Sequence, residues 1–151
     1  SIVYRYQSKL EKEDWHTNML SELQHAAMLA GWVQNHCVVG LSHAIAHQLG
    51  NFNVGHGLAN GLLMPSVIDF NSQDQAVEHK YEQLIKNAGL PSIQALLDLF
   101  EGLTLGQGVS LDLSDEQLYN IAKNALLDPA AATNPVAFTE DDVKEIVKKC
   151  L

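Results

Sequence analysis

Cysteine is scarce in this 151-residue chain, and its two cysteines, Cys37 and Cys150, lie far apart without CxxC spacing. This excludes a zinc ribbon and a disulfide-stapled scaffold, so we expect two free thiols in a reducing compartment. The sequence also shows no signal peptide and no run of 18 apolar residues, the length from which a membrane-spanning helix is inferred. We therefore expect a soluble, cytoplasmic protein that makes no contact with a membrane.

Basic residues are also few. The chain has 9 Lys and Arg against 18 Asp and Glu, which gives a net charge of −9. Phosphate backbones are bound by clustered Lys and Arg, so the composition argues against a nucleic-acid partner. With 46% hydrophobic residues the chain can bury one core, but it is too short for two ordinary domains. We therefore predict a single domain over residues 1–151.

Charge is missing altogether from one long stretch. Between Glu22 and Asp69 the sequence contains no Asp, Glu, Lys or Arg, although about 25% of the residues in an average chain are charged. Histidine, asparagine and glutamine interrupt the stretch, so it is not a membrane span. We predict a buried segment whose neutral polar groups need hydrogen-bond partners or a function.

Apolar residues recur with helical spacing almost everywhere, and no segment shows sustained strand alternation, although residues 2–6 are ambiguous. The sequence therefore predicts an all-α helical bundle, with Trp15 and Trp32 as packing residues of its first long helix. Helices are expected over residues 14–35 and 57–70, the latter with a kink at Pro65. A shorter helix is expected between them, from residue 41 to its end at Gly50, and further helices carry the apolar positions of residues 77–88, 93–100, 118–125 and 143–147.

Histidine is concentrated where charge is absent, because five of the seven histidines lie between positions 25 and 56. His43 and His47 are four residues apart and so share one helix face. His56 follows directly after a turn rich in Asn and Gly. Imidazole binds Fe, Zn, Cu and Ni, so these three side chains form a candidate metal site.

A histidine pair with this spacing is also common on helix surfaces without a function. The uncharged setting and the many small residues around the pair favour a functional site over that alternative. His25 and His36, in contrast, are interpreted as core or helix-end residues.

A divalent cation in an apolar pocket needs negative charge nearby, and neutral imidazoles supply none. A carboxylate must therefore come from outside the uncharged stretch. The nearest acidic residues in the sequence are Asp14, Glu22, Asp69 and Asp74. Their neighbours are typical of solvated helix ends, so we expect the missing ligand to lie outside these 151 residues.

Residues 40–71, GLSHAIAHQLGNFNVGHGLANGLLMPSVIDFN, resemble the second signature region of the iron-containing alcohol dehydrogenases. In that region a His-Ala-x-Ala-His helix is followed by a Leu-Gly turn, a His-Gly pair and a helix that ends near Pro and Phe-Asn. The resemblance extends to residues 19–31 and to the C-terminal stretch TNPVAFTEDDVKEIVKKCL, and so covers nearly the whole chain.

The resemblance implies the all-α C-terminal domain of the dehydroquinate synthase and iron-containing alcohol dehydrogenase superfamily, here as a fragment without its N-terminal nucleotide-binding domain. It implies an enzyme that transfers hydride between an alcohol or sugar-derived hydroxyl and NAD or NADP, with Fe²⁺ or Zn²⁺ as Lewis acid. The nucleotide would be bound mainly by the absent domain, so the fragment is not expected to be active alone. A small alcohol or aldehyde substrate and a homodimeric partner are also expected.

The site residues implied by the resemblance are three. His43 and His56 match two of the family's metal ligands, and His47 matches a catalytic histidine close to the nicotinamide and substrate. Three features depart from the family pattern. The family's other two metal ligands, an Asp and a His on an earlier helix, have no counterpart in this sequence. The interval from His47 to His56 is one residue shorter than in the family, and Gly55 stands where a Pro often precedes the histidine. A dehydroquinate-synthase-like metalloenzyme domain and a non-catalytic helical module are the alternatives.

Overall fold

A computed structural model describes residues 2–104 and 109–151. These residues contain helices and turns but no strand, so the predicted all-α fold is confirmed. The helices are α1 (Ile2–Glu11), α2 (Thr17–Gln34), α3 (Leu41–Leu49), α4 (His56–Asn71), α5 (Gln75–Ala88), α6 (Ile93–Thr104), α7 (Asp115–Leu127) and α8 (Glu140–Cys150), with short 3₁₀ helices η1 (Gly50–Phe52) and η2 (Pro129–Thr133).

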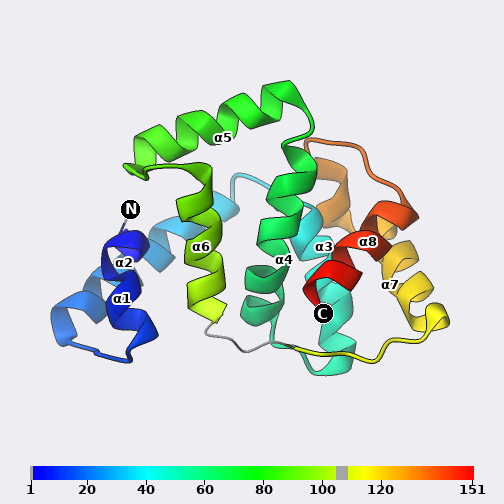
Figure 1. Cartoon of the computed structure of the whole chain (residues 1–151), viewed down its shortest axis with the longest axis horizontal. Coiled ribbons are helices and arrows are strands. Elements are labelled where there is room, and N and C mark those ends of the chain that lie inside the picture. The colour runs from blue at the N-terminus through cyan, green and yellow to red at the C-terminus, as the bar shows by residue number, and fades with distance from the viewer. Residues whose placement is uncertain (1, 105–108) are drawn as a thin grey trace.

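Helix α3 is the centre of the bundle, between α4 and α7 (Figure 1). Its buried positions surround most of the helix: Leu41, Ser42, Ala44, Ile45, Ala46 and Leu49. Only positions 43, 47 and 48 are less buried. Apolar spacing therefore fixes α3 in the core and leaves one face, which carries the two histidines, turned outward.

The other helices pack around α3 and α4. Helix α8 packs on both α7 and α4, while α6 covers another side of α4 and α1 packs against α6 (Figure 1). Helix α6 packs closely against α4 at Gly61. A Cβ atom added there would lie only 3.0 Å from the Thr104 methyl group. Helix α4 continues through Pro65 without interruption. Helix α8 begins with a reciprocal capping box between Thr139 and Asp142.

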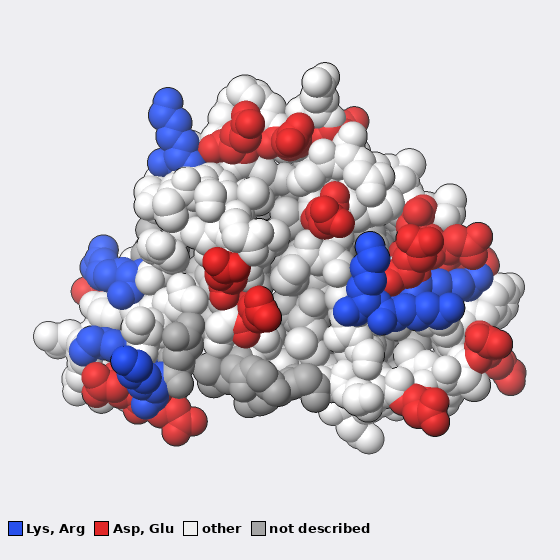
Figure 2. All heavy atoms as spheres, viewed as in Figure 1, with Lys and Arg blue, Asp and Glu red and all other residues white. Residues whose placement is uncertain are grey.

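Acidic and basic side chains both lie on the surface of the molecule. Figure 2 shows the lysines of α8 beside acidic side chains on the same face. Among the described residues, no helix combines the length and apolarity that crossing a bilayer requires.

The prediction that the whole uncharged stretch is buried is wrong for its first part. In α2 only Met19 is buried, and Trp15 and Trp32, expected to pack, are 53% and 64% exposed. His25 and His36 are exposed as well. The His36 ring approaches the Trp32 carbonyl oxygen at 2.8 Å and so lies at the helix end. Helical periodicity identified the apolar positions but could not show what covers them.

Asn134 links the start of α3 to the end of α4 through hydrogen bonds. Its side-chain oxygen accepts a hydrogen bond from the Leu41 backbone N–H (3.2 Å), in place of the cap that Gly40 cannot provide. Its amide nitrogen donates to the side-chain oxygen of buried Asn71 (2.8 Å) and to the Val136 carbonyl (2.8 Å). This network holds the start of α3 against the end of α4.

Replacing Asn134 by alanine should lower the free energy of unfolding by about 1–3 kcal/mol, because it leaves buried donors and acceptors unpaired. Urea denaturation followed by circular dichroism measures the change. Asn124→Ala on the exposed face of α7 is the matched control and should stay within about 0.5 kcal/mol of the parent chain. Equal stabilities for the two variants would show that the Asn134 network contributes nothing.

Candidate metal site

The three predicted histidines converge. The ring centres of His43 and His56 lie 5.1 Å apart, those of His47 and His56 5.4 Å, and those of His43 and His47 6.2 Å. His43 and His47 are one turn apart on α3, and His56 is the first residue of α4. The structure thus brings together all three residues that the sequence singled out.

The connection between α3 and α4 explains how His56 reaches the other two rings. Chain direction reverses through η1, and Asn53 then adopts a left-handed conformation with φ of 60°, which Asn tolerates better than most residues. Val54 anchors the turn in the core. The interval from His47 to His56, one residue shorter than the family pattern, therefore still places His56 beside His43.

The distance between the His43 and His56 rings suits a shared ligand. Two imidazoles that bind one ion through nitrogens at about 2.1 Å, at a tetrahedral angle, have ring centres about 5 Å apart. The observed 5.1 Å matches this geometry. The His56 Nε2 atom lies 3.3 Å from the Asn60 amide nitrogen one turn along α4.

The site opens at the surface. His47 and His56 are exposed and His43 is half-buried. Burial lowers the pKa of His43, and the neighbouring His56 and His47 lower it further, against an opposing effect of Asp128. Both main causes favour the neutral imidazole, which is the form that coordinates a metal.

Asp128 is the functional candidate that the sequence analysis missed. Its Oδ2 lies 2.9 Å from Nδ1 of His47, and its Oδ1 accepts a hydrogen bond from the Ala130 backbone N–H at the start of η2. Its side chain is 13% exposed. Burial raises the pKa of Asp128, but the hydrogen bonds from His47 and Ala130 outweigh it, and the net pKa is lowered. Asp128 is therefore a carboxylate beside the histidines.

Three of the four carboxylates nearest in sequence have other partners. Glu22 pairs with Arg5 at 3.0 Å, Asp14 approaches Lys9 at 3.5 Å, and Asp74 caps α5. No sequence signal indicated Asp128, because 81 residues separate it from His47.

In the described parts of the chain, no three His, Cys, Asp or Glu side chains are arranged to hold a metal ion by themselves. Two imidazoles at ligand spacing and a nearby carboxylate nevertheless fit part of a coordination shell for iron or zinc. The described residues therefore supply two imidazoles and one carboxylate to a candidate metal site.

Comparisons with known proteins identify the family of the chain. The family model for the Fe-containing alcohol dehydrogenase family, C-terminal, matches residues 2–151. The chain is 31% identical over 157 residues to alcohol dehydrogenase 4 of Saccharomyces cerevisiae, covering 99% of this chain and 40% of the relative. It is 30% identical over 169 residues to the 1-propanol dehydrogenase PduQ of Salmonella typhimurium, covering 99% and 45%.

Solved structures support the same fold. The alcohol dehydrogenase from Oenococcus oeni superposes with a TM-score of 0.73 at 24% identity, over 99% of this chain and 43% of that one. An iron-containing alcohol dehydrogenase from Thermococcus thioreducens gives a TM-score of 0.62 at 26% identity, over 74% and 31%. The chain thus spans less than half the length of these relatives.

Proposed function

The chain belongs to the iron-containing alcohol dehydrogenase family, whose C-terminal model it matches over residues 2–151, and from this we propose that it is the metal-binding part of an NAD(P)-dependent alcohol dehydrogenase. The single observation that carries the proposal is the convergence of His43 and His56 at ligand spacing. The match to this family also favours a dehydrogenase over a dehydroquinate-synthase-like enzyme.

We propose that the rest of the enzyme lies in a nucleotide-binding domain N-terminal to this one. The chain covers only 40% and 45% of the yeast and Salmonella relatives, and among its described residues no group of three or more His, Cys, Asp or Glu side chains is placed to hold a metal ion. The missing ligands and most of the NAD(P) site would then come from that domain. Residues 1–151 should therefore show no dehydrogenase activity alone.

His43 and His56 would hold Fe²⁺ or Zn²⁺ through ring nitrogens. When bound, the ion would act as a Lewis acid towards the oxygen of a small alcohol or aldehyde, and the nicotinamide would carry the hydride. Neutral imidazole ligands would hold the ion without cancelling its charge.

His47 would accept the proton of the alcohol hydroxyl group. A carboxylate can only accept a hydrogen bond, so the bond to Asp128 places the proton of the neutral imidazole on Nδ1 and leaves a lone pair on Nε2. That nitrogen would be the base that takes up the hydroxyl proton of the alcohol, directly or through water. Asp128 then stabilises the imidazolium that forms.

Metal titration tests the proposal. The melting temperature of residues 1–151 and of a full-length protein with the N-terminal domain should be followed with increasing Zn²⁺ or Fe²⁺. We expect weak binding by residues 1–151. The longer protein should bind strongly, gaining about 2.7 kcal/mol when the metal is at 100 times its dissociation constant.

Two results would contradict the proposal. A full-length protein that carries no metal after preparation with Fe²⁺ or Zn²⁺ would favour the non-catalytic helical module. Equal, tight binding by residues 1–151 alone would show that no ligand is missing.

A further inference from the structure

Carboxamide side chains surround a small hollow where α3 and η1 meet α7. The hollow has a volume of about 140 Å³. Its lining positions on α7 recur every three to four residues and so form one stripe of that helix. The polar side chains of the lining are all carboxamides, and we call them the amide cluster: Gln48, Asn51, Gln117, Asn120 and Asn124.

The floor of the hollow is apolar. Ile121 is only 3% exposed, and Phe52 is half-buried and packs against the hydrophobic core. Around this floor four of the five carboxamide residues, all except Gln48, are exposed. The hollow therefore combines an apolar floor with a polar rim, as small-molecule sites generally do.

Two members of the amide cluster use only one end of their carboxamide. Gln48 donates from its amide nitrogen to the Ala44 carbonyl (3.3 Å). Gln117 accepts a hydrogen bond from the Ser114 backbone N–H through its side-chain oxygen (2.9 Å). Within the described part of the chain, the oxygen of Gln48 and the amide nitrogen of Gln117 make no further side-chain hydrogen bond. The first remains an acceptor and the second a donor.

The three asparagines keep their full hydrogen-bonding capacity. Among residues 2–104 and 109–151, no hydrogen bond engages the side chains of Asn51, Asn120 or Asn124. A carboxamide offers two N–H donors and one accepting oxygen, and a hydroxyl group both donates and accepts. A molecule with several hydroxyl groups therefore satisfies several members of the amide cluster at once.

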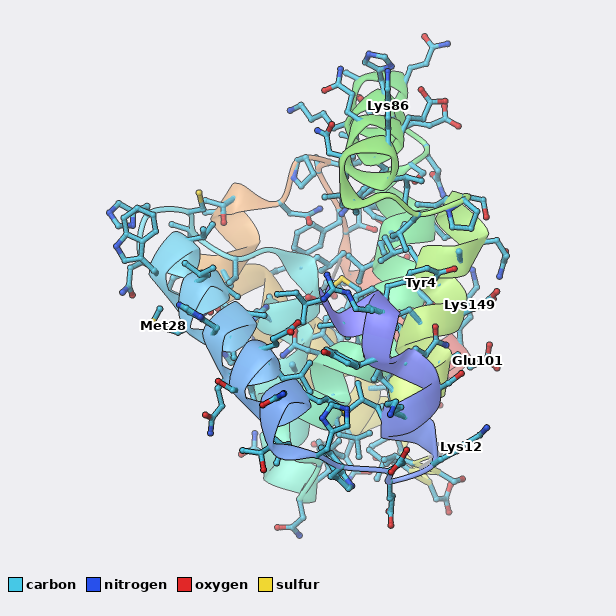
Figure 3. The ribbon with its side chains drawn as sticks, turned by 90° about the vertical axis from the view of Figure 1, so that its left-hand side faces the viewer. Tyr4, Lys12, Met28, Lys86, Glu101 and Lys149 are labelled. Carbon is cyan, nitrogen blue, oxygen red and sulfur yellow. The ribbon has the colours of Figure 1, made fainter. Side chains whose placement is uncertain are left out.

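The lining that the structure describes contains no charged residue. The hollow between α4 and α5 differs, because Asp69, Glu78 and Glu82 line it. Figure 3 shows the charged side chains of Lys86 and Glu101 on α5 and α6, on another side of the molecule. A phosphate or carboxylate at the amide cluster would find no cation, and an amine would find no carboxylate. The ligand that fits is therefore uncharged.

We propose that the amide cluster binds a neutral polyhydroxy compound, of the size of one sugar ring or a short linear polyol. The hollow is smaller than the about 300–1,000 Å³ of sites for drug-sized ligands. The C–H face of the ligand lies on Phe52 and Ile121, and its hydroxyl groups reach the carboxamides of the rim. His43 and His56 do not line the hollow, and the proposal does not rest on the metal site.

Saturation-transfer NMR of the full-length, metal-free protein tests the proposal, with D-glucose and sorbitol as probes. We expect saturable binding, tighter for glucose if the site takes a ring and tighter for sorbitol if it takes a linear polyol. The double variant Asn120→Ala and Asn124→Ala should bind at least tenfold more weakly, because it removes two hydrogen-bonding groups. Both side chains are exposed, so the melting temperature should stay that of the parent.

Two controls separate hydroxyl recognition from other effects. Asn87→Ala removes an exposed carboxamide from α5 and should leave the affinity for both probes unchanged. 1,6-Hexanediol has the carbon chain length of sorbitol but only two hydroxyl groups, so it should bind the parent protein at least tenfold more weakly than sorbitol.

Three results would overturn the proposal. Neither probe might show saturable binding to the parent protein. The Asn120→Ala and Asn124→Ala double variant might bind as tightly as the parent, which would place the ligand elsewhere. Equal affinity for sorbitol and 1,6-hexanediol would show that apolar contact, and not the amide cluster, holds the ligand.

Discussion

Combined replacement of His43 and His56 by alanine should abolish metal binding by the full-length protein. Loss of a group that only orients a metal ligand weakens binding about 10- to 100-fold, so loss of two direct ligands should weaken it by more than about 100-fold. Neither ring is part of the buried core, so the variant should keep its helical circular dichroism spectrum. Metal content after dialysis and competition with a chromophoric chelator measure the effect.

The matched control is His79→Ala. His79 lies on α5, where it pairs with Glu82 at 3.2 Å on an exposed face. This variant should bind metal as tightly as the parent protein. The control thus shows whether removal of any histidine, or only of the site histidines, lowers metal binding. Unchanged metal content, or full activity, in the His43→Ala and His56→Ala double variant would refute the enzyme function proposed above.

Asp128→Asn should lower kcat of the full-length enzyme by about 100-fold or more, the lower range of what a positioned acid or base contributes. Asparagine has one oxygen and one amide nitrogen where Asp128 has two accepting oxygens. If its oxygen keeps the Ala130 N–H, its amide donates to His47 Nδ1 and moves the imidazole proton to Nε2. The nitrogen that should accept the substrate proton is then occupied, while metal content and KM should change little.

Nitrogen NMR of the His47 ring reports the tautomer directly and separates this effect from a structural one. The parent protein should show the proton on Nδ1, and Asp128→Asn should show it on Nε2. Asp115→Asn, at the exposed first turn of α7, is the control and should change neither kcat nor the tautomer. An Asp128→Asn enzyme with normal kcat would remove Asp128 from the mechanism.

The histidine site could be predicted from the sequence because its geometry is local. A spacing of four residues places His43 and His47 on one helix face, and a short turn returns the chain to His56. Asp128 could not be predicted in this way. It reaches His47 only because α7 packs against α3, and nothing in the residues around Asp128 indicates that packing.

The helices followed a similar pattern. Those with a buried apolar face, such as α3 and α8, were expected at nearly their observed positions. The segment of residues 2–6, ambiguous in sequence, belongs to helix α1. For α2 the apolar positions were recognised, but their burial depends on what lies against them. Trp15 and Trp32 are exposed within these 151 residues.

The most direct test of the metal site is a crystal structure of the full-length protein prepared with Fe²⁺ or Zn²⁺, with anomalous scattering measured at the absorption edge of the metal. We expect an anomalous peak within about 2.0–2.2 Å of a ring nitrogen of both His43 and His56, with His47 hydrogen-bonded to Asp128 and not coordinated. A structure in which the two rings point apart, or in which the metal lies elsewhere, would contradict the assignment of this site.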